Sequence, residues 1–192
     1  MRNNLSFIVL ALALTLSVTL SSCAKKKVSA DEMALRNKTA SVNIQLGMKY
    51  LERNDIQRAK RKLMIALEQS PELPEAWYAM GYYLESTNNI KASEKYYLKA
   101  LQLAPNRGDV QNNYGTHLCR VGQYHKAIEH FKKAAADPGY LDIASAYENA
   151  GLCALELPDK HLAEDFFRLA LSQDSQRKLA KVELSKLTKD RG

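Results

Sequence analysis

Apolar residues along most of the chain recur every three or four positions, the spacing of one face of an α-helix. Alternating apolar and polar runs, the pattern of a half-buried strand, are absent from the sequence. Glycine, proline and asparagine interrupt the helical pattern at regular places and indicate where each helix ends. The sequence therefore predicts an all-α fold with helices at residues 31–53, 56–69, 74–87, 90–103, 108–121, 124–136, 142–157, 159–172 and 176–188.

Four glycines divide this pattern into repeated units. Gly47, Gly81 and Gly115 are each 34 residues apart, and Gly151 follows at 36. Small residues stand twelve and nineteen positions after each glycine, and a large residue stands sixteen positions after it: Leu63, Tyr97, Phe131 and Phe167. Small residues let two antiparallel helices approach closely, and the large residue fills the gap between them. Each unit is therefore expected to be a helix pair.

The segment at residues 77–84, Trp-Tyr-Ala-Met-Gly-Tyr-Tyr-Leu, resembles the signature of the tetratricopeptide repeat, as does the 34-residue period. The resemblance implies a solenoid of four helix pairs with units at about 40–73, 74–107, 108–141 and 144–177. The helix at 176–188 is expected to cap the end of the stack, with Leu179, Val182 and Leu187 towards one face.

The first 22 residues have the pattern of a signal peptide. Arg2 is followed by an uncharged apolar run from Leu5 to Leu20, and this run is shorter than the ~20 residues that span a bilayer. A signal peptide is therefore favoured over a membrane-spanning anchor. The segment Leu-Ser-Ser-Cys ending at Cys23 resembles the bacterial lipobox. The resemblance implies a signal peptide at 1–22, a lipidated tether at 23–30 and a repeat domain at 31–192.

Acylation of Cys23 would make this cysteine a membrane anchor, because two or three acyl chains hold a protein on a bilayer almost permanently. The alternative is a free cysteine near an ordinary cleavage site. Residue 24 is Ala, not the Asp that retains many Gram-negative lipoproteins in the inner membrane. By that family rule the chain is expected on the outer membrane, facing the periplasm.

The net charge of +7 falls to +6 when residues 1–22 are removed, because Arg2 is their only charged residue. A basic chain can indicate nucleic-acid binding, but export disfavours that partner. The basic residues are spaced along the predicted helices and are interpreted as mainly solvated faces.

No motif in the sequence indicates catalysis. The four histidines are His117, His125, His130 and His161, and none has the spacing of a metal-ligand pair with another histidine or with the cysteines. There is no glycine-rich phosphate loop and no nucleophile elbow. We expect histidines at the surface or in a groove, and a protein that is not an enzyme and uses no cofactor, metal or small-molecule substrate.

Cys119 and Cys153 fall on the first helices of adjacent units. Neighbouring helix axes lie about 8–10 Å apart, and a disulfide needs Cα atoms within about 7 Å. An exported protein meets an oxidising compartment, so a disulfide is feasible. Two buried thiols are the alternative, and the sequence leaves both open.

Tyr78 and Tyr82 lie one helical turn apart, on the face that lines the concave groove in tetratricopeptide stacks. The same face of the first unit carries Ile44, Met48 and Leu51. Because these positions are not among those that keep step with the glycines, we interpret them as a partner-binding groove. The alternative is that the tether or the start of the first helix covers them.

Two further stretches of the sequence indicate a more specific function. Residues 112–119 and the segment 137–155, with Asp-Pro-Gly-Tyr at its start, resemble the type IV pilus biogenesis and stability lipoproteins, the PilF/PilW family of pilotins. The resemblance implies an outer-membrane lipoprotein that binds secretin subunits and promotes their localisation and multimerisation. The alternative is a lipid-anchored repeat scaffold for another envelope machine, in β-barrel assembly or peptidoglycan synthesis. A tethered hydrolase would need a catalytic cluster, and the sequence shows none.

Overall fold

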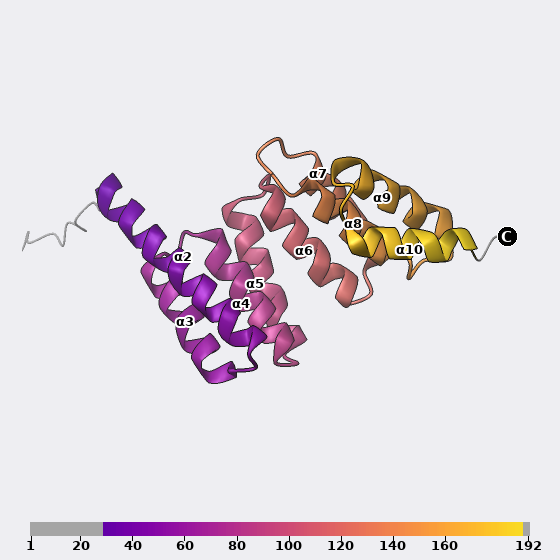
Figure 1. The fold of residues 1–192 in the computed structure, drawn as a ribbon. Helices are drawn as coiled ribbons and strands as arrows, with labels where there is room; N and C mark the ends of the chain where they lie inside the picture. Colours follow the sequence, from indigo (N-terminus) through magenta and orange to yellow (C-terminus); the bar gives the residue numbers. More distant parts are fainter. Residues whose placement is uncertain (1–28, 190–192) are drawn as a thin grey trace, which may run out of the picture. The chain divides into compact units, whose positions relative to one another are not determined.

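The computed structural model describes residues 29–189, so the predicted signal peptide and Cys23 lie outside the described residues. The chain divides into two compact units, Met1–Glu32 and Met33–Gly192, and the second holds nearly all of the described chain. All regular structure in the described range is helical (Figure 1): α2 (Ala30–Glu52), α3 (Ile56–Gln69), α4 (Pro74–Ser86), α5 (Ile90–Leu103), α6 (Gly108–Arg120), α7 (Tyr124–Ala135), α8 (Ile143–Ala154), α9 (Lys160–Gln173) and α10 (Lys178–Lys189).

The all-α prediction is confirmed, and no helix bound differs from its predicted position by more than three residues. The turns inside the first three helix pairs explain this agreement. Asn54, Asn88 and Gly122 stand 34 residues apart, and all three have positive φ angles, of 56°, 60° and 79°. Asparagine and glycine tolerate this left-handed conformation best, so they end the first helix of each pair. Pro74, at the first position of α4, marks the start of a unit.

Each repeated glycine faces the large residue that follows sixteen positions later. A Cβ atom added to Gly115 would lie 2.8 Å from Cε1 of Phe131, closer than real side chains approach. The other three pairs have the same geometry, with closest approaches of 2.7 to 2.9 Å: Gly47 with Leu63, Gly81 with Tyr97, and Gly151 with Phe167. The glycines therefore let the two helices of each pair come together over one large buried side chain.

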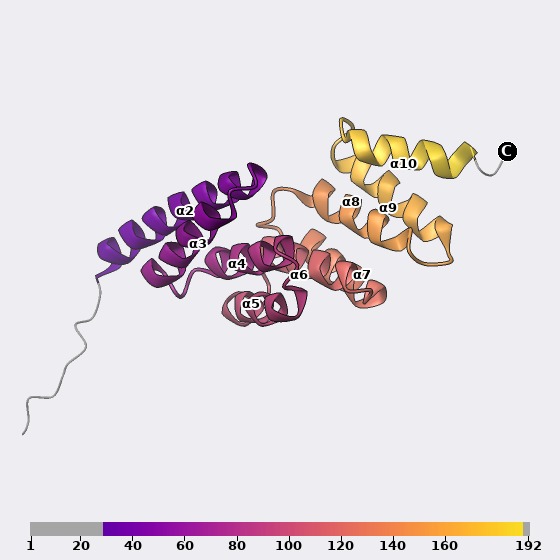
Figure 2. The same cartoon turned by 90° about the horizontal axis from the view of Figure 1, so that it is seen from below.

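Within the Met33–Gly192 unit, the first helices of the pairs lie along one side and the second helices along the other. Figure 2 shows α3, α5, α7 and α9 on the side opposite to α2, α4, α6 and α8. One buried cluster joins α3 to α4 around Leu63 and Met80, with side chains of α2 packed against it. A larger one joins α6 to α10 around Phe131 and Phe167. The core therefore runs between the helix layers.

The capping helix α10 docks through a different face from the predicted one. Ala180 is fully buried, and Leu184 and Leu187 pack against the core cluster, whereas Leu179 and Val182 are 42% and 50% exposed. The prediction was therefore wrong for Leu179 and Val182. Positions 180, 184 and 187 form a regular helical stripe, and the small Ala180 permits close approach. The Glu148 side chain on α8 fixes this docking by accepting a hydrogen bond from the Ala180 N–H at 3.1 Å.

Candidate partner-binding surface

The predicted groove residues are divided between packing and exposure. Ile44, Met48, Leu51 and Tyr78 are partly buried and pack against the core cluster that joins α3 to α4. Tyr82, on α4, is 38% exposed. The premise that the core does not need this face is therefore wrong for the first four residues, and Tyr82 is the most exposed of the five. Partner binding at this face stays a prediction.

Tyr78 takes part in a polar network between the second and third units. Its hydroxyl donates a hydrogen bond to Oδ2 of Asp109 at 3.2 Å. Arg107 forms ion pairs with the same carboxylate and with Glu75, each at 2.5 Å. Burial, followed by the nearby Asp109 charge, raises the pKa of Tyr78 well above its usual range. Tyr78 therefore remains protonated and acts as a structural donor, which could not be inferred from its position in the repeat.

Tyr82 and Arg120 form the exposed part of the surface between α4 and α6. The Arg120 guanidinium lies 6.0 Å from the centre of the Tyr82 ring, within the range of a cation–π contact. Arg120 also forms an ion pair with the buried carboxylate of Glu85, and its own side chain is 40% exposed. An aromatic ring beside a guanidinium can take an apolar side chain together with an acidic group, so the pair is suited to binding a polypeptide segment.

The buried carboxylate of Glu85 joins three helices. It accepts a hydrogen bond from the Tyr97 hydroxyl of α5 at 3.1 Å and lies 2.6 Å from Nδ1 of His117 on α6. Arg120 is its third partner. A buried charge is costly unless it is paired and hydrogen-bonded, and these three donors meet that requirement. Glu85 therefore holds the Arg120 side chain in place and links the second unit to the third.

His117 is buried, with a side-chain exposure of 2%, so the expectation of a surface or groove histidine is wrong for this residue. Its ring stacks on the Tyr97 ring with centroids 4.8 Å apart. Burial lowers the pKa of His117, so near neutral pH the ring is uncharged and its Nδ1–H donates to Glu85. His130 is half-buried beside Gln111, and burial lowers its pKa too. His125 and His161 are exposed.

A cavity of about 400 Å³ opens beside Arg120, between the third and fourth units. Thr116 and Leu152 each directly follow a repeated glycine, as Tyr82 does, and both line this cavity. The full lining is Thr116, Cys119, Arg120, Tyr124, Phe131, Asn149, Leu152 and Glu156. The cavity thus continues the exposed surface of Tyr82 and Arg120 onto the next helix pair.

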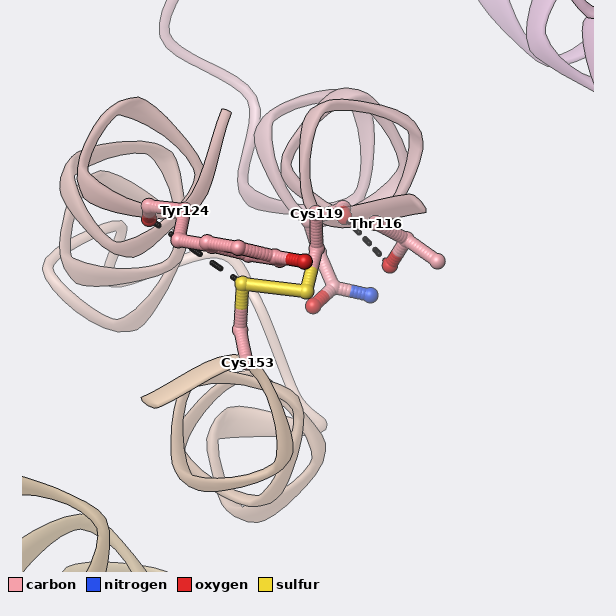
Figure 3. Close-up of a disulfide and its surroundings, with 5 residues drawn as sticks. Thr116, Cys119, Tyr124 and Cys153 are labelled. Atoms are coloured by element: carbon pink, nitrogen blue, oxygen red, sulfur yellow. Dashed lines mark hydrogen bonds between the residues drawn. A yellow bond between two sulfur atoms is a disulfide. The ribbon is translucent and has the colours of Figure 1, made fainter. Parts of the chain in front are cut away.

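A disulfide between Cys119 and Cys153 borders this cavity. The two Cα atoms are 5.7 Å apart, within the range that such a bond requires. Figure 3 shows the cysteines reaching from two helices, with the Tyr124 side chain alongside the bond. The bond links the first helices of the third and fourth units and fixes the wall that Cys119 contributes to the cavity.

Sequence reasoning missed Thr116, Arg120 and Leu152. The signal that could have found Thr116 and Leu152 is the repeat register itself, because both occupy the position of Tyr82 in the following units. Arg120 stands five residues after Gly115, where the second unit has Ser86. The role of Arg120 depends on its ion pair with Glu85, which is distant in sequence, so the repeat register alone does not identify Arg120.

Within residues 29–189, no helix combines the length and apolar composition that crossing a membrane requires. Nor do these residues bring together three or more His, Cys, Asp or Glu side chains in an arrangement that could hold a metal ion.

Comparison with known proteins identifies the class of this solenoid. Models of the tetratricopeptide repeat match residues 74–107 and 115–178. Together with the helix pairs and their glycine register, these matches show that the chain belongs to the tetratricopeptide-repeat family, whose stacked units form extended concave binding surfaces.

Within this class, the chain is similar to the type IV pilus assembly protein PilF of Pseudomonas aeruginosa. The two sequences are 29% identical over 182 residues, which cover 92% of this chain and 71% of PilF. An uncharacterized protein of Haemophilus influenzae is 32% identical over 128 residues, 66% of this chain and 72% of that protein.

The structural comparison gives PilF again and adds PilW. The P. aeruginosa PilF structure matches with a TM-score of 0.74 and 29% identity, covering 81% of this chain and 71% of that one. PilW, a widely conserved type IV pilus biogenesis factor, matches with a TM-score of 0.72 and 27% identity over 79% of this chain and 69% of its own. The resemblance to the PilF/PilW family is confirmed.

Proposed function

We propose that this chain is a type IV pilus biogenesis protein that acts as a pilotin. In this proposal it is an outer-membrane lipoprotein, anchored through Cys23, that binds secretin subunits in the periplasm and promotes their localisation and multimerisation. It acts by binding and catalyses no reaction. The observation that carries the proposal is the similarity to PilF over 92% of the chain.

The surface around Tyr82, Arg120 and the neighbouring cavity supports a binding role. It offers an aromatic ring, a guanidinium held by a buried carboxylate, and a cavity of about 400 Å³ on the next helix pair. A lipid anchor would confine each bound subunit to the membrane surface. Confinement raises the effective concentration of subunits for one another, which favours multimers without any further contact.

The experiment that tests the function compares secretin in a strain with and without this gene. We expect the strain that lacks it to have secretin monomers displaced from the outer membrane, and the intact gene to restore multimers there. Normal secretin multimers in the deletion strain would overturn the proposal. A defect in β-barrel assembly or peptidoglycan synthesis instead would support the alternative of a scaffold for another envelope machine.

The binding surface is tested with Tyr82→Ser. This variant is preferable to a change at Tyr78, whose ring packs on the core and whose hydroxyl bonds Asp109. We expect secretin capture by the purified protein to fall by at least about tenfold if Tyr82 is a hot spot. The matched control is Leu169→Ser on α9, which removes a side chain that is 41% exposed. Equal capture by both variants would place the binding surface elsewhere.

A further inference from the structure

The charge of the repeat domain is unevenly divided between its two helix layers. The second helices α3, α5 and α7 together carry ten basic and three acidic residues, a net charge of +7. The first helices α4, α6 and α8 carry one basic and four acidic residues, a net charge of −3. Because the two layers lie on opposite sides of the Met33–Gly192 unit (Figure 2), one side of that unit is strongly positive.

Most of these basic side chains are available to a ligand. Lys60 and Arg61 on α3 and Lys91 and Lys95 on α5 are exposed. Within residues 29–189 none of these four side chains forms an ion pair, whereas Arg58 on α3 pairs with Asp55. On α7, Lys132 pairs with Glu129 at 3.4 Å, and Lys133 is exposed. The positive charge of this layer is therefore largely uncompensated.

Two apolar side chains lie among these charges. Met64 on α3 and Leu98 on α5 are 34 residues apart, so they occupy the same place on successive second helices, and each is 44% exposed. Beside Met64, an open hollow of about 400 Å³ lies along α3 between Lys60, Arg61 and Ile65. Basic side chains around exposed apolar ones are the composition that lets a helix surface bind the interface of an anionic bilayer.

We propose that the outer surface of α3, α5 and α7, which we call the basic face, docks on a bilayer that contains anionic phospholipids. The lysines and arginines would contact the lipid phosphates, and Met64 and Leu98 would enter the headgroup region. Docking in the cell rests on the proposed function, because the lipid anchor would keep the basic face close to the membrane. Docking would turn the first helices, with Tyr82 and Arg120, away from the membrane and towards a periplasmic partner.

A bilayer fits these observations better than an acidic protein does. The charge is spread over the second helices of three units rather than concentrated in one groove, and the exposed apolar residues Met64 and Leu98 lie on two different helices. A lipid surface is broad and offers phosphates everywhere, so it needs no precise complementarity.

The test uses a chain that begins at residue 24 and therefore cannot be acylated at Cys23. Residues 24–192 contain the whole Met33–Gly192 unit with its core. Cosedimentation is measured with phosphatidylcholine vesicles, with and without phosphatidylglycerol. The test variant is Lys60→Glu with Lys95→Glu. The control, Lys178→Glu with Lys181→Glu on exposed positions of α10, changes the net charge by the same amount.

We expect binding only to vesicles with phosphatidylglycerol, weaker at high salt. The partitioning of the test variant should fall about 30-fold, because each basic residue near an anionic bilayer adds to the free energy of binding. The partitioning of the control should fall far less. Absence of binding to the anionic vesicles, or equal losses in the two variants, would overturn the proposal, and in the first case an acidic protein becomes the partner to seek. Secretin capture in solution should be unchanged by Lys60→Glu with Lys95→Glu, so this result is independent of the pilotin function.

Discussion

Each repeated glycine is a single residue on which the packing of a whole helix pair depends. In Gly115→Ala the new methyl group would lie 2.8 Å from Cε1 of Phe131, which is fully surrounded by core atoms and has little room to move. We expect the free energy of unfolding to fall by about 1–3 kcal/mol, the usual cost of overpacking. Urea denaturation of the purified domain measures this change.

Gly139→Ala is the control for that substitution. There an added Cβ would meet only the Asp137 side chain, at 3.4 Å, which is an ordinary contact. We expect a change within about 0.5 kcal/mol, as for most surface positions. If both variants were equally stable, the close approach of Phe131 would not be the reason that position 115 requires glycine.

The buried His117 makes a second prediction at the scale of the residue. Burial lowers its pKa in the folded protein, so below about pH 6.5 the unfolded chain binds a proton that the folded chain does not. The free energy of unfolding should therefore decrease as the pH falls through that value, by at most about 1.4 kcal/mol per pH unit for one histidine. His130, whose pKa is also lowered, acts in the same direction.

The contribution of His117 is isolated by His117→Gln, since glutamine can still donate a hydrogen bond to Glu85 but does not titrate. Unfolding free energies are measured between about pH 8 and about pH 5 for both proteins. The variant should show a shallower decrease towards acid pH. Equal slopes would mean that His117 does not titrate differently in the folded and unfolded states.

At the scale of the helix, the disulfide between α6 and α8 is the strongest single link. Closing a loop of 34 residues should stabilise the fold by about 3–4 kcal/mol in the chain-entropy model. We expect Cys119→Ala with Cys153→Ala to lower the unfolding free energy by up to that amount, and reductant to affect only the unmodified protein. The bond in the exported protein is checked by thiol titration of the denatured, unreduced chain, and two free thiols would contradict it.

The helices themselves could be predicted from sequence because their boundaries depend on local residues. Asn54, Asn88 and Gly122 end helices through their own backbone preferences, and Pro74 starts one through its own geometry. The buried face of α10 is harder to predict, because Leu179 and Val182 are as apolar as the residues that pack against the core. Only the neighbouring helices decide which stripe is buried, and that information is not local.

The side-chain network beneath the proposed binding surface could not be predicted from sequence, for the same reason. Tyr82 is singled out in the sequence because it lies one turn from Tyr78 on the groove face and outside the positions that keep step with the glycines. The partners of Glu85 come from α5 and α6, and His117 is 32 residues away. A buried carboxylate with three donors leaves no periodic signal in one sequence, so this network and the role of Arg120 required the structure.

At the scale of the whole molecule, the main prediction concerns its attachment. Cys23 lies outside the described residues, and its acylation stays a prediction from the lipobox. Labelled palmitate should enter the protein in cells, and Cys23→Ala should abolish labelling and remove the protein from the outer-membrane fraction, since acyl chains supply the attachment. Absence of label in the unmodified protein would refute the anchor.

The Cys119–Cys153 bond also decides how the chain responds to mechanical force. A pull on the N-terminus against the C-terminus can straighten α2 to α5, most of α6, α9 and α10, at up to about 3.6 Å per residue. It cannot draw residues 119 and 153 apart, because the sulfur bridge carries the load past the intervening segment. Because the bond carries the load directly, α7 and nearly all of α8 are shielded from tension, and an oxidised molecule extends less than a reduced one under the same load.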